Sequence, residues 1–220
     1  MRLVIAATIM AVAAATPAPA QTSPGPPIAG IIKSFDGKTL SLTGSDGQTT
    51  TIALAPQTRI FLSVPRTLAD IRPGDFIASA GTRGPDGVLR ANEIRIFPAP
   101  LGEGQFPMTK PGQTMTNATV KQVVTGATVK QISGGGTPVI KLSFRGAAPA
   151  GSSNCTGRAA DAPGGPGTGC VGETEFEVPA DIPIVAWLPA ERSVLTKGTK
   201  ANVAVAQADP PTATRIIVSR

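Results

Sequence analysis

The chain has 220 residues and a net charge of +6, and it contains neither histidine nor tyrosine. The lack of histidine excludes serine–histidine and cysteine–histidine catalytic triads and most zinc sites. Aromatic residues make up only 4% of the chain and the basic residues form no run, so the composition argues against a nucleic-acid partner.

The first 20 residues have the pattern of a cleaved secretory signal peptide. Arg2 precedes an apolar run at 3–15, and Ala18-Pro19-Ala20 supplies the small residues of a cleavage site. The apolar run is shorter than the roughly 20 residues that a transmembrane helix needs. We therefore expect cleavage after Ala20, no membrane span, and a periplasmic or secreted protein.

After a flexible lead-in at 21–27, the first half of the chain alternates apolar and polar residues in short segments, which is typical of β-strands. Turn dipeptides such as Asp46-Gly47 separate the segments, and the sequence LADIRPGD at 68–75 predicts a further turn. The expected strands are 28–34, 39–43, 49–54, 58–62, 76–80 and 88–97. Their close spacing predicts an antiparallel β-barrel domain over 28–98.

A stretch rich in proline and glycine at 99–115 shows no periodicity and is interpreted as a linker. The strand pattern then returns, and it predicts a second β-barrel domain over 116–220. The expected strands of this domain are 118–124, 127–133, 139–144, 174–178, 182–187, 201–206 and 214–219. No segment shows a helical period over ten or more residues.

Cys155 and Cys170 are the only cysteines. In an oxidising compartment they are expected to form a disulfide, which would stabilise the loop between them by about 3 kcal/mol through chain entropy. The alternative, a redox-active pair, is disfavoured because catalytic cysteines are usually spaced as C-x-x-C.

The two halves align as an internal repeat. Ile60 aligns with Ile184 and Gly74 with Gly198, both 124 positions apart, and the starts of the halves align at a shorter spacing. The change in spacing places an insertion at about 145–172, which contains the two cysteines. A duplication explains this agreement; the alternative is that small β units look alike because their turns and alternation are generic.

Several motifs of the first half resemble a family of exported bacterial proteins, the domain of unknown function 5666 family. The resemblance rests on Gly30-Ile31-Ile32, Thr39-Leu40-Ser41-Leu42, Thr58-Arg59-Ile60, LADIRPGDF at 68–76, and Ala91-Asn92-Glu93-Ile94. The second half is a weaker match, because Lys197-Gly198-Thr199 replaces the Pro-Gly-Asp of the turn. The resemblance implies a small OB-like β-barrel, and it implies no activity, ligand or catalytic residue.

Two groups of residues are candidates for a weak ligand contact. Glu173, Glu175 and Glu177 alternate along one predicted strand, so their carboxylates share a face and could bind a hard cation; the alternative is a solvated face that protects a sheet edge. Trp187 is the only tryptophan and either stacks on a ligand or packs in the core. Asp70 and Asp75 are better explained as turn-stabilising residues than as a catalytic pair. No metal or cofactor site is predicted.

Together these patterns predict an all-β protein with two small OB-like antiparallel barrels in tandem, the second with a disulfide-stapled insertion. The expected function is that of a non-catalytic binding or accessory module of the bacterial envelope. Two alternatives stay open: a hydrolase-type enzyme without histidine acting on envelope components, and an OB-like oligosaccharide-binding module. The expected partner is another envelope protein or a polysaccharide.

Overall fold

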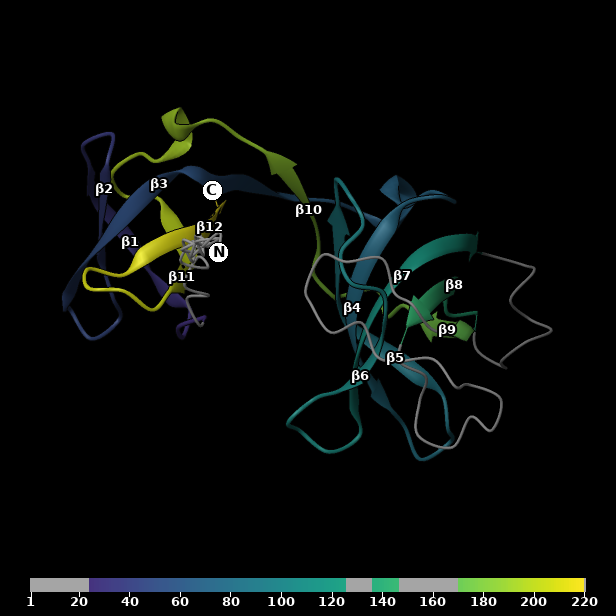
Figure 1. Ribbon diagram of the computed structural model, residues 1–220. Helices are drawn as coiled ribbons and strands as arrows, with labels where there is room; N and C mark the ends of the chain where they lie inside the picture. Colours follow the sequence, from purple (N-terminus) through teal and green to yellow (C-terminus); the bar gives the residue numbers. More distant parts are fainter. Residues whose placement is uncertain (1–23, 126–135, 147–169, 220) are drawn as a thin grey trace, which may run out of the picture.

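A computed structural model describes residues 24–125, 136–146 and 170–219, and it is all-β with a closed five-stranded barrel (Figure 1). The predicted signal peptide, the predicted strand 127–133, Cys155 and most of the predicted insertion lie outside the described residues. The expected pairing of Cys155 with Cys170 therefore stays a prediction.

The closed barrel combines strands from both ends of the chain. Its strands are β1 (Ile28–Phe35), β2 (Thr39–Thr43), β3 (Thr49–Pro65), β11 (Lys200–Ala206) and β12 (Thr212–Ser219). Neighbouring strands follow the order β1, β2, β3, β12, β11 and return to β1. All these pairs are antiparallel except β3 with β12, which run parallel.

The second unit has the same strand order. It consists of β4 (Phe76–Arg83), β5 (Leu89–Phe97), β7 (Gln113–Val124), β8 (Val139–Gly146) and β9 (Cys170–Glu177). The order runs β5, β4, β7, β8, β9, and β9 meets β5 in parallel at a single pair, Arg90 with Glu177. A short strand, β6 (Gly104–Pro107), pairs with β7 inside the segment expected to be a linker.

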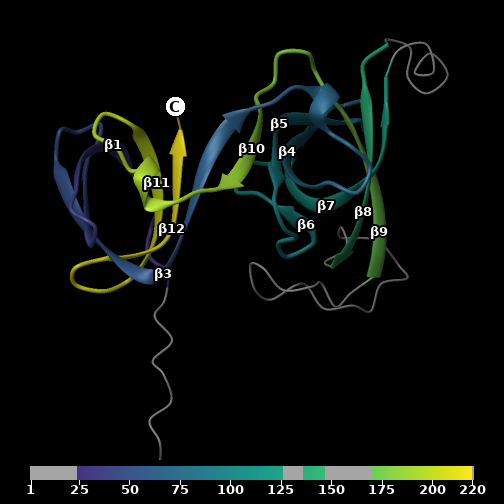
Figure 2. The same cartoon turned by 90° about the horizontal axis from the view of Figure 1, so that it is seen from above.

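Each unit therefore takes three strands from one half of the chain and two from the other. The halves 28–98 and 116–220 were expected to close separately, but β4 and β5 pair with the second half, and β11 and β12 pair with the first. Figure 2 shows β3 and β10 (Ile184–Pro189) running between the two units. These two strands pair antiparallel over five residue pairs, with Ser63 opposite Trp187 at the centre.

Residues aligned by the predicted repeat occupy matching places in the two units. Ile60 pairs with Ile216 in the barrel, and Ile184 pairs with Ile94 beside the second unit. The irregularities match as well: the register shifts after Ile32 in the barrel and after the aligned Val120 in the second unit. The same local pattern thus sets the strand register in both places.

The two units have separate apolar cores. The barrel core contains Ile32, Leu40, Leu42, Ile52, Leu54, Ile60, Leu195, Ala201, Val203, Val205, Ala213, Ile216 and Val218. The core of the second unit contains Ile71, Ile77, Leu89, Ala91, Ile94, Ala118, Val120, Ile140, Leu142, Phe144, Phe176, Val178 and Ile184. Because alternate strand residues face inward, the period-2 pattern of the sequence places these side chains inside.

Two local elements differ from the sequence-based expectation or refine it. The predicted strands 49–54 and 58–62 are one continuous strand, β3, in which the residues around Pro56 bulge away from β12. The predicted turn at 68–75 begins with a 3₁₀ turn, η1 (Leu68–Asp70), which is capped by Thr67 and Asp70. Asp75 stabilises the next turn by accepting a 2.7 Å hydrogen bond from the backbone N–H of Arg72.

No helix in the described part of the chain is long and apolar enough to cross a membrane.

Candidate functional site

Trp187 lies where the two units meet and is almost buried, with 8% of its surface exposed. Its ring contacts Phe97 at the end of β5 edge-on, with 4.8 Å between ring centroids, and it lies 5.9 Å from the Phe61 ring on β3. The sequence left open whether Trp187 packs or binds a ligand. The structure shows that Trp187 packs against Phe97 and Phe61. The charged residues around its ring decide whether it can also contribute to ligand binding.

Two arginine side chains lie against the same indole ring. The guanidinium carbon of Arg215 on β12 is 5.2 Å from the ring centroid, and that of Arg95 on β5 is 6.0 Å away. Both distances are within the range of cation–π attraction. A third arginine, Arg59, is the β3 residue paired with Arg215, so its side chain starts next to that of Arg215. We call Trp187, Arg59, Arg95 and Arg215 the junction cluster.

The junction cluster has more positive than negative charge nearby. Arg95 forms a 2.8 Å ion pair with Glu93, and Glu93 is the one acidic residue that lines the groove at this place. The Nε atom of Arg215 is buried and has no hydrogen-bond partner among the described residues. Burial, followed by repulsion from Arg59 and Arg95, lowers the pKa of Arg215 below its ordinary value. Arginine stays protonated all the same, so the cluster contains a partly buried and incompletely compensated cation.

An open groove of about 370 Å³ runs along the cluster. Its walls come from five strands, β3, β5, β10, β11 and β12, so it exists only because the strands are exchanged between the halves. Besides Arg95, Arg215 and Trp187, the groove is lined by Ser63, Glu93, Ile94, Pro183, Val185, Asn202, Ile217 and Ser219. A groove with guanidinium groups and an aromatic edge can hold an anionic group by charge and hydrogen bonds.

The three glutamates singled out from the sequence lie on β9, and each one pairs with a different cation. Glu173 bonds Lys121 at 2.6 Å, Glu175 bonds Lys141 at 3.1 Å, and Glu177 bonds Arg90 at 3.0 Å. Within the described residues, no group of three or more His, Cys, Asp or Glu side chains comes together in a way that could hold a metal ion. The structure thus places these carboxylates in cross-strand ion pairs rather than around one point.

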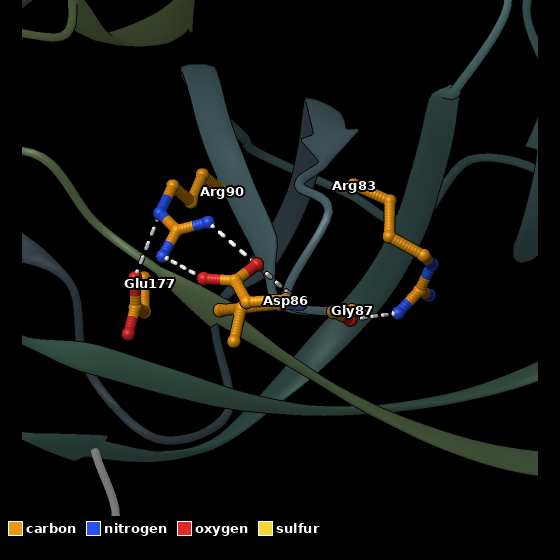
Figure 3. Close-up of polar contacts among 6 residues, drawn as sticks. Arg83, Asp86, Gly87, Arg90 and Glu177 are labelled. Carbon is orange, nitrogen blue, oxygen red and sulfur yellow. Dashed lines mark hydrogen bonds and ion pairs between the residues drawn. The ribbon is translucent and has the colours of Figure 1, made fainter.

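Glu177 belongs to a small ion-pair network at the closing edge of the second unit (Figure 3). Arg90 bonds both carboxylate oxygens of Asp86, at 3.0 and 2.7 Å, and also reaches Glu177. The Arg90 guanidinium holds the pKa of Asp86 at about 2, well below its usual value, with further help from the Val88 N–H. Arg83 donates a hydrogen bond to the Gly87 carbonyl across the same turn.

A hollow of about 350 Å³ lies beside this network, between the 83–89 turn and strands β8 and β9. Its main charged groups, Arg83, Glu175 and Glu177, already have partners within the protein. The junction cluster instead offers a buried donor that has no partner in the described part of the chain, and for this reason we place the candidate site there.

Sequence reasoning found Trp187 but missed Arg59, Arg95 and Arg215. These arginines are far apart in the chain and have no motif in common, and the strand pairing alone brings them together. One signal was present: Arg59 lies directly before Ile60, which aligns in the repeat with Ile184, a residue three positions before Trp187. The alignment alone does not bring Arg59 close to Trp187. It does so only together with the pairing of these two segments, which the sequence did not predict.

Comparison with protein-family models, with curated proteins and with solved structures gave no match for this chain. The resemblance to the domain of unknown function 5666 family therefore rests on the quoted motifs alone.

Proposed function

We propose that this protein is a non-catalytic binding or accessory factor of the bacterial envelope. The observation that carries the proposal is the junction cluster, in which an aromatic ring and two arginines, Arg95 and Arg215, line one groove, with Arg59 paired beside Arg215. Arginine has five N–H donors and no accessible lone pair at neutral pH. Such a groove is suited to binding a ligand and poorly suited to proton transfer or nucleophilic attack.

The proposal includes an architecture. In it, two OB-like barrel modules arose by duplication, exchanged their last two strands, and the second gained an insertion stapled by Cys155 and Cys170. The matching registers at Ile60 and Ile184 and the identical strand orders of the two units support the duplication. The export pattern at 1–20 and the motifs quoted above support an envelope location.

The test is capture from a periplasmic extract on the immobilised mature chain, residues 21–220. We expect saturable retention of an envelope component, loss of that retention in the double variant Arg95→Gln/Arg215→Gln, and no change in the control Arg72→Gln. Arg72 is an exposed arginine in the turn before β4, away from the junction cluster. Equal capture by all three chains would refute a binding role for this groove.

The same material distinguishes the enzymatic alternative. A hydrolase would convert the captured component, and mass spectrometry of the eluate would show a product whose formation one substitution abolishes. We expect the component to be released unchanged.

One observation favours a second candidate, an OB-like oligosaccharide-binding module. In the proposed OB-like architecture, the hollow beside β8 and β9 corresponds to the face where OB-folds bind their ligands. If this hollow is the binding site, Glu175→Gln will weaken capture and Arg95→Gln/Arg215→Gln will not.

A further inference from the structure

We propose that the groove at the junction cluster binds an acidic saccharide through a phosphate or carboxylate group held by Arg215 and Arg95. This inference rests on the proposed binding function and specifies the ligand class. It concerns the groove between the two units rather than the β8–β9 face.

The first argument is the unsatisfied donor. Buried polar groups in proteins are nearly always hydrogen-bonded, and an unpaired one costs free energy. The Nε atom of Arg215 is buried without a partner among the residues that the structure describes, although the side chain borders an open groove. A small rotation of the Arg215 side chain towards the groove would let an oxygen atom of a ligand supply the missing acceptor.

The second argument is the balance of charge. Arg59 and Arg215 lie side by side on parallel strands, Arg95 approaches the same ring, and Glu93 neutralises only Arg95. Like charges at paired strand positions repel each other. An anion in the groove would convert this repulsion into attraction to a shared partner.

The third argument is geometry. A guanidinium group presents two parallel N–H donors that match the oxygens of a phosphate or a carboxylate. The Trp187 ring holds the guanidinium of Arg215 in place by cation–π contact, so less side-chain freedom is lost on binding. Ser63, Asn202 and Ser219 line the same groove and can bond the hydroxyl groups around such an anion.

The surroundings favour a saccharide over a single-stranded nucleic acid. Nucleic-acid grooves present exposed aromatic faces on which successive bases stack. Here Trp187 is 8% exposed and its ring is covered by Phe97 and the arginines, so no stacking platform faces the groove. Small polar side chains of the kind that bond sugar hydroxyls are present instead.

Trp187 is the only tryptophan of the chain, so its fluorescence reports on the groove directly. The probes are inorganic phosphate, glucose 1-phosphate, a galacturonate oligomer, a neutral maltooligosaccharide and a short single-stranded DNA, each titrated into the mature chain. We expect a saturable change with the galacturonate oligomer or with glucose 1-phosphate, and this comparison separates carboxylate from phosphate recognition. Inorganic phosphate should bind more weakly and the neutral oligosaccharide should give no change.

Arg215→Gln should weaken binding of the best acidic saccharide by roughly tenfold or more, because a charge-assisted hydrogen-bond partner is lost. Arg215→Lys keeps the positive charge but lacks the two parallel N–H donors, so its affinity should lie between those of the wild type and Arg215→Gln. The control Arg72→Gln should bind as the wild type does. Arg95→Gln provides an independent variant if Arg215→Gln unfolds, and thermal unfolding of each variant checks this.

Equal binding by Arg215→Gln, Arg95→Gln and the wild type would overturn the inference, as would equal binding of the neutral oligosaccharide. DNA binding stronger than that of every saccharide would overturn the ligand class. If an envelope component is captured equally well by the wild type and by the Arg95→Gln/Arg215→Gln variant, the protein has a binding function but the groove does not bind this ligand. If the acidic saccharide binds but no envelope component is captured, the groove assignment stands and the accessory role fails.

Discussion

The closed barrel and the second unit share one strand order but differ where the chain crosses between them. In the barrel, β3 is continuous from Thr49 to Pro65 and pairs with β12 on both sides of a bulge. In the second unit, the aligned stretch is split into β9, which ends at Glu177, and β10, which begins at Ile184. The matching pairs Ile60 with Ile216 and Ile184 with Ile94 therefore form both in a continuous strand, β3, and after an interruption, in β10.

Proline and a side-chain hydrogen bond explain this difference. The interruption contains two prolines, Pro179 and Pro183, which lack the N–H donor that a strand uses for pairing, whereas the aligned segment of the barrel contains one, Pro56. Within that aligned segment, Thr58 uses its hydroxyl group to bond the Ala213 carbonyl at 2.8 Å. The crossing segment of the barrel therefore stays attached to β12, and that of the second unit is free to bend towards the junction.

At the junction itself the two halves differ in chemistry. Ser63 of one half lies opposite Trp187 of the other at the centre of the β3–β10 pair, and these two positions align in the predicted repeat. Arg215 likewise aligns with Glu93. The two cores keep apolar residues at most aligned positions, such as Ile60 and Ile184, so the groove is a prominent departure from symmetry.

The largest expected effect comes from cutting the chain between β5 and β6. A protease site inserted at Pro100-Leu101 would release the halves if each closed on itself. Because each unit contains strands of both halves, we expect the cut halves to co-elute in size-exclusion chromatography and to separate only in denaturant. Their stability should also become dependent on protein concentration. Separation of the halves under native conditions would contradict the exchange.

A smaller effect is expected from exchanging a pair of core residues between the units. In the second unit, Gly81 leaves room for the Phe176 ring, which a Cβ at that glycine would overlap. The aligned residues of the barrel core are Val205 and Ile52. Gly81→Val should therefore destabilise the protein by about 1–3 kcal/mol through overpacking.

The double variant Gly81→Val/Phe176→Ile should recover most of that loss, because it reproduces the pair found in the barrel. Urea unfolding of both single variants and the double variant forms a thermodynamic cycle, with an expected coupling of about 0.5–3 kcal/mol. Simple additivity of the two single effects would show that the cores are not equivalent at this place.

The smallest effect concerns the ion-pair network that closes the second unit. The pKa of Asp86 is lowered to about 2 by Arg90, so this carboxylate stabilises the fold above its ordinary pKa of 3.8, and the stabilisation is lost as the pH falls towards 2. Asp86→Asn should lower the free energy of unfolding slightly at pH 7. The difference from the wild type should shrink as the pH falls from about 4 to 2, as measured by urea unfolding at each pH. A difference that is constant down to pH 2 would mean that the charge on Asp86 is irrelevant.

Much of the local structure could be predicted from the sequence. Strand β2 has the predicted bounds of Thr39 and Thr43, and the inward residues Leu40 and Leu42 are fully buried. The turn function of Asp75 was predicted as well, because a short side chain beside Pro-Gly bonds the local backbone. Alternation and turn residues act over a few positions, so they can be interpreted without knowledge of the fold.

The candidate site could be predicted only in part. Trp187 was noticed because it is unique, whereas Arg215 is one of 20 basic residues and nothing in its neighbourhood marks it. Its importance arises from burial next to Arg59 and Arg95, and both of these contacts cross from one half of the chain to the other.

The sequence by itself determined most of the strands, their inward faces and the registers available to them, because these depend on period-2 alternation and on turn chemistry. It did not determine which strand pair, β4–β5 or β11–β12, completes which unit, since the two pairs offer the same register and nearly the same apolar face. The tertiary structure decided this through β3, which continues straight to Pro65 and pairs with β10 instead of turning back. Because β3 and β10 cross between the units, β4–β5 completes the second unit and β11–β12 completes the barrel. The same crossing creates the groove in which Trp187, Arg95 and Arg215 meet.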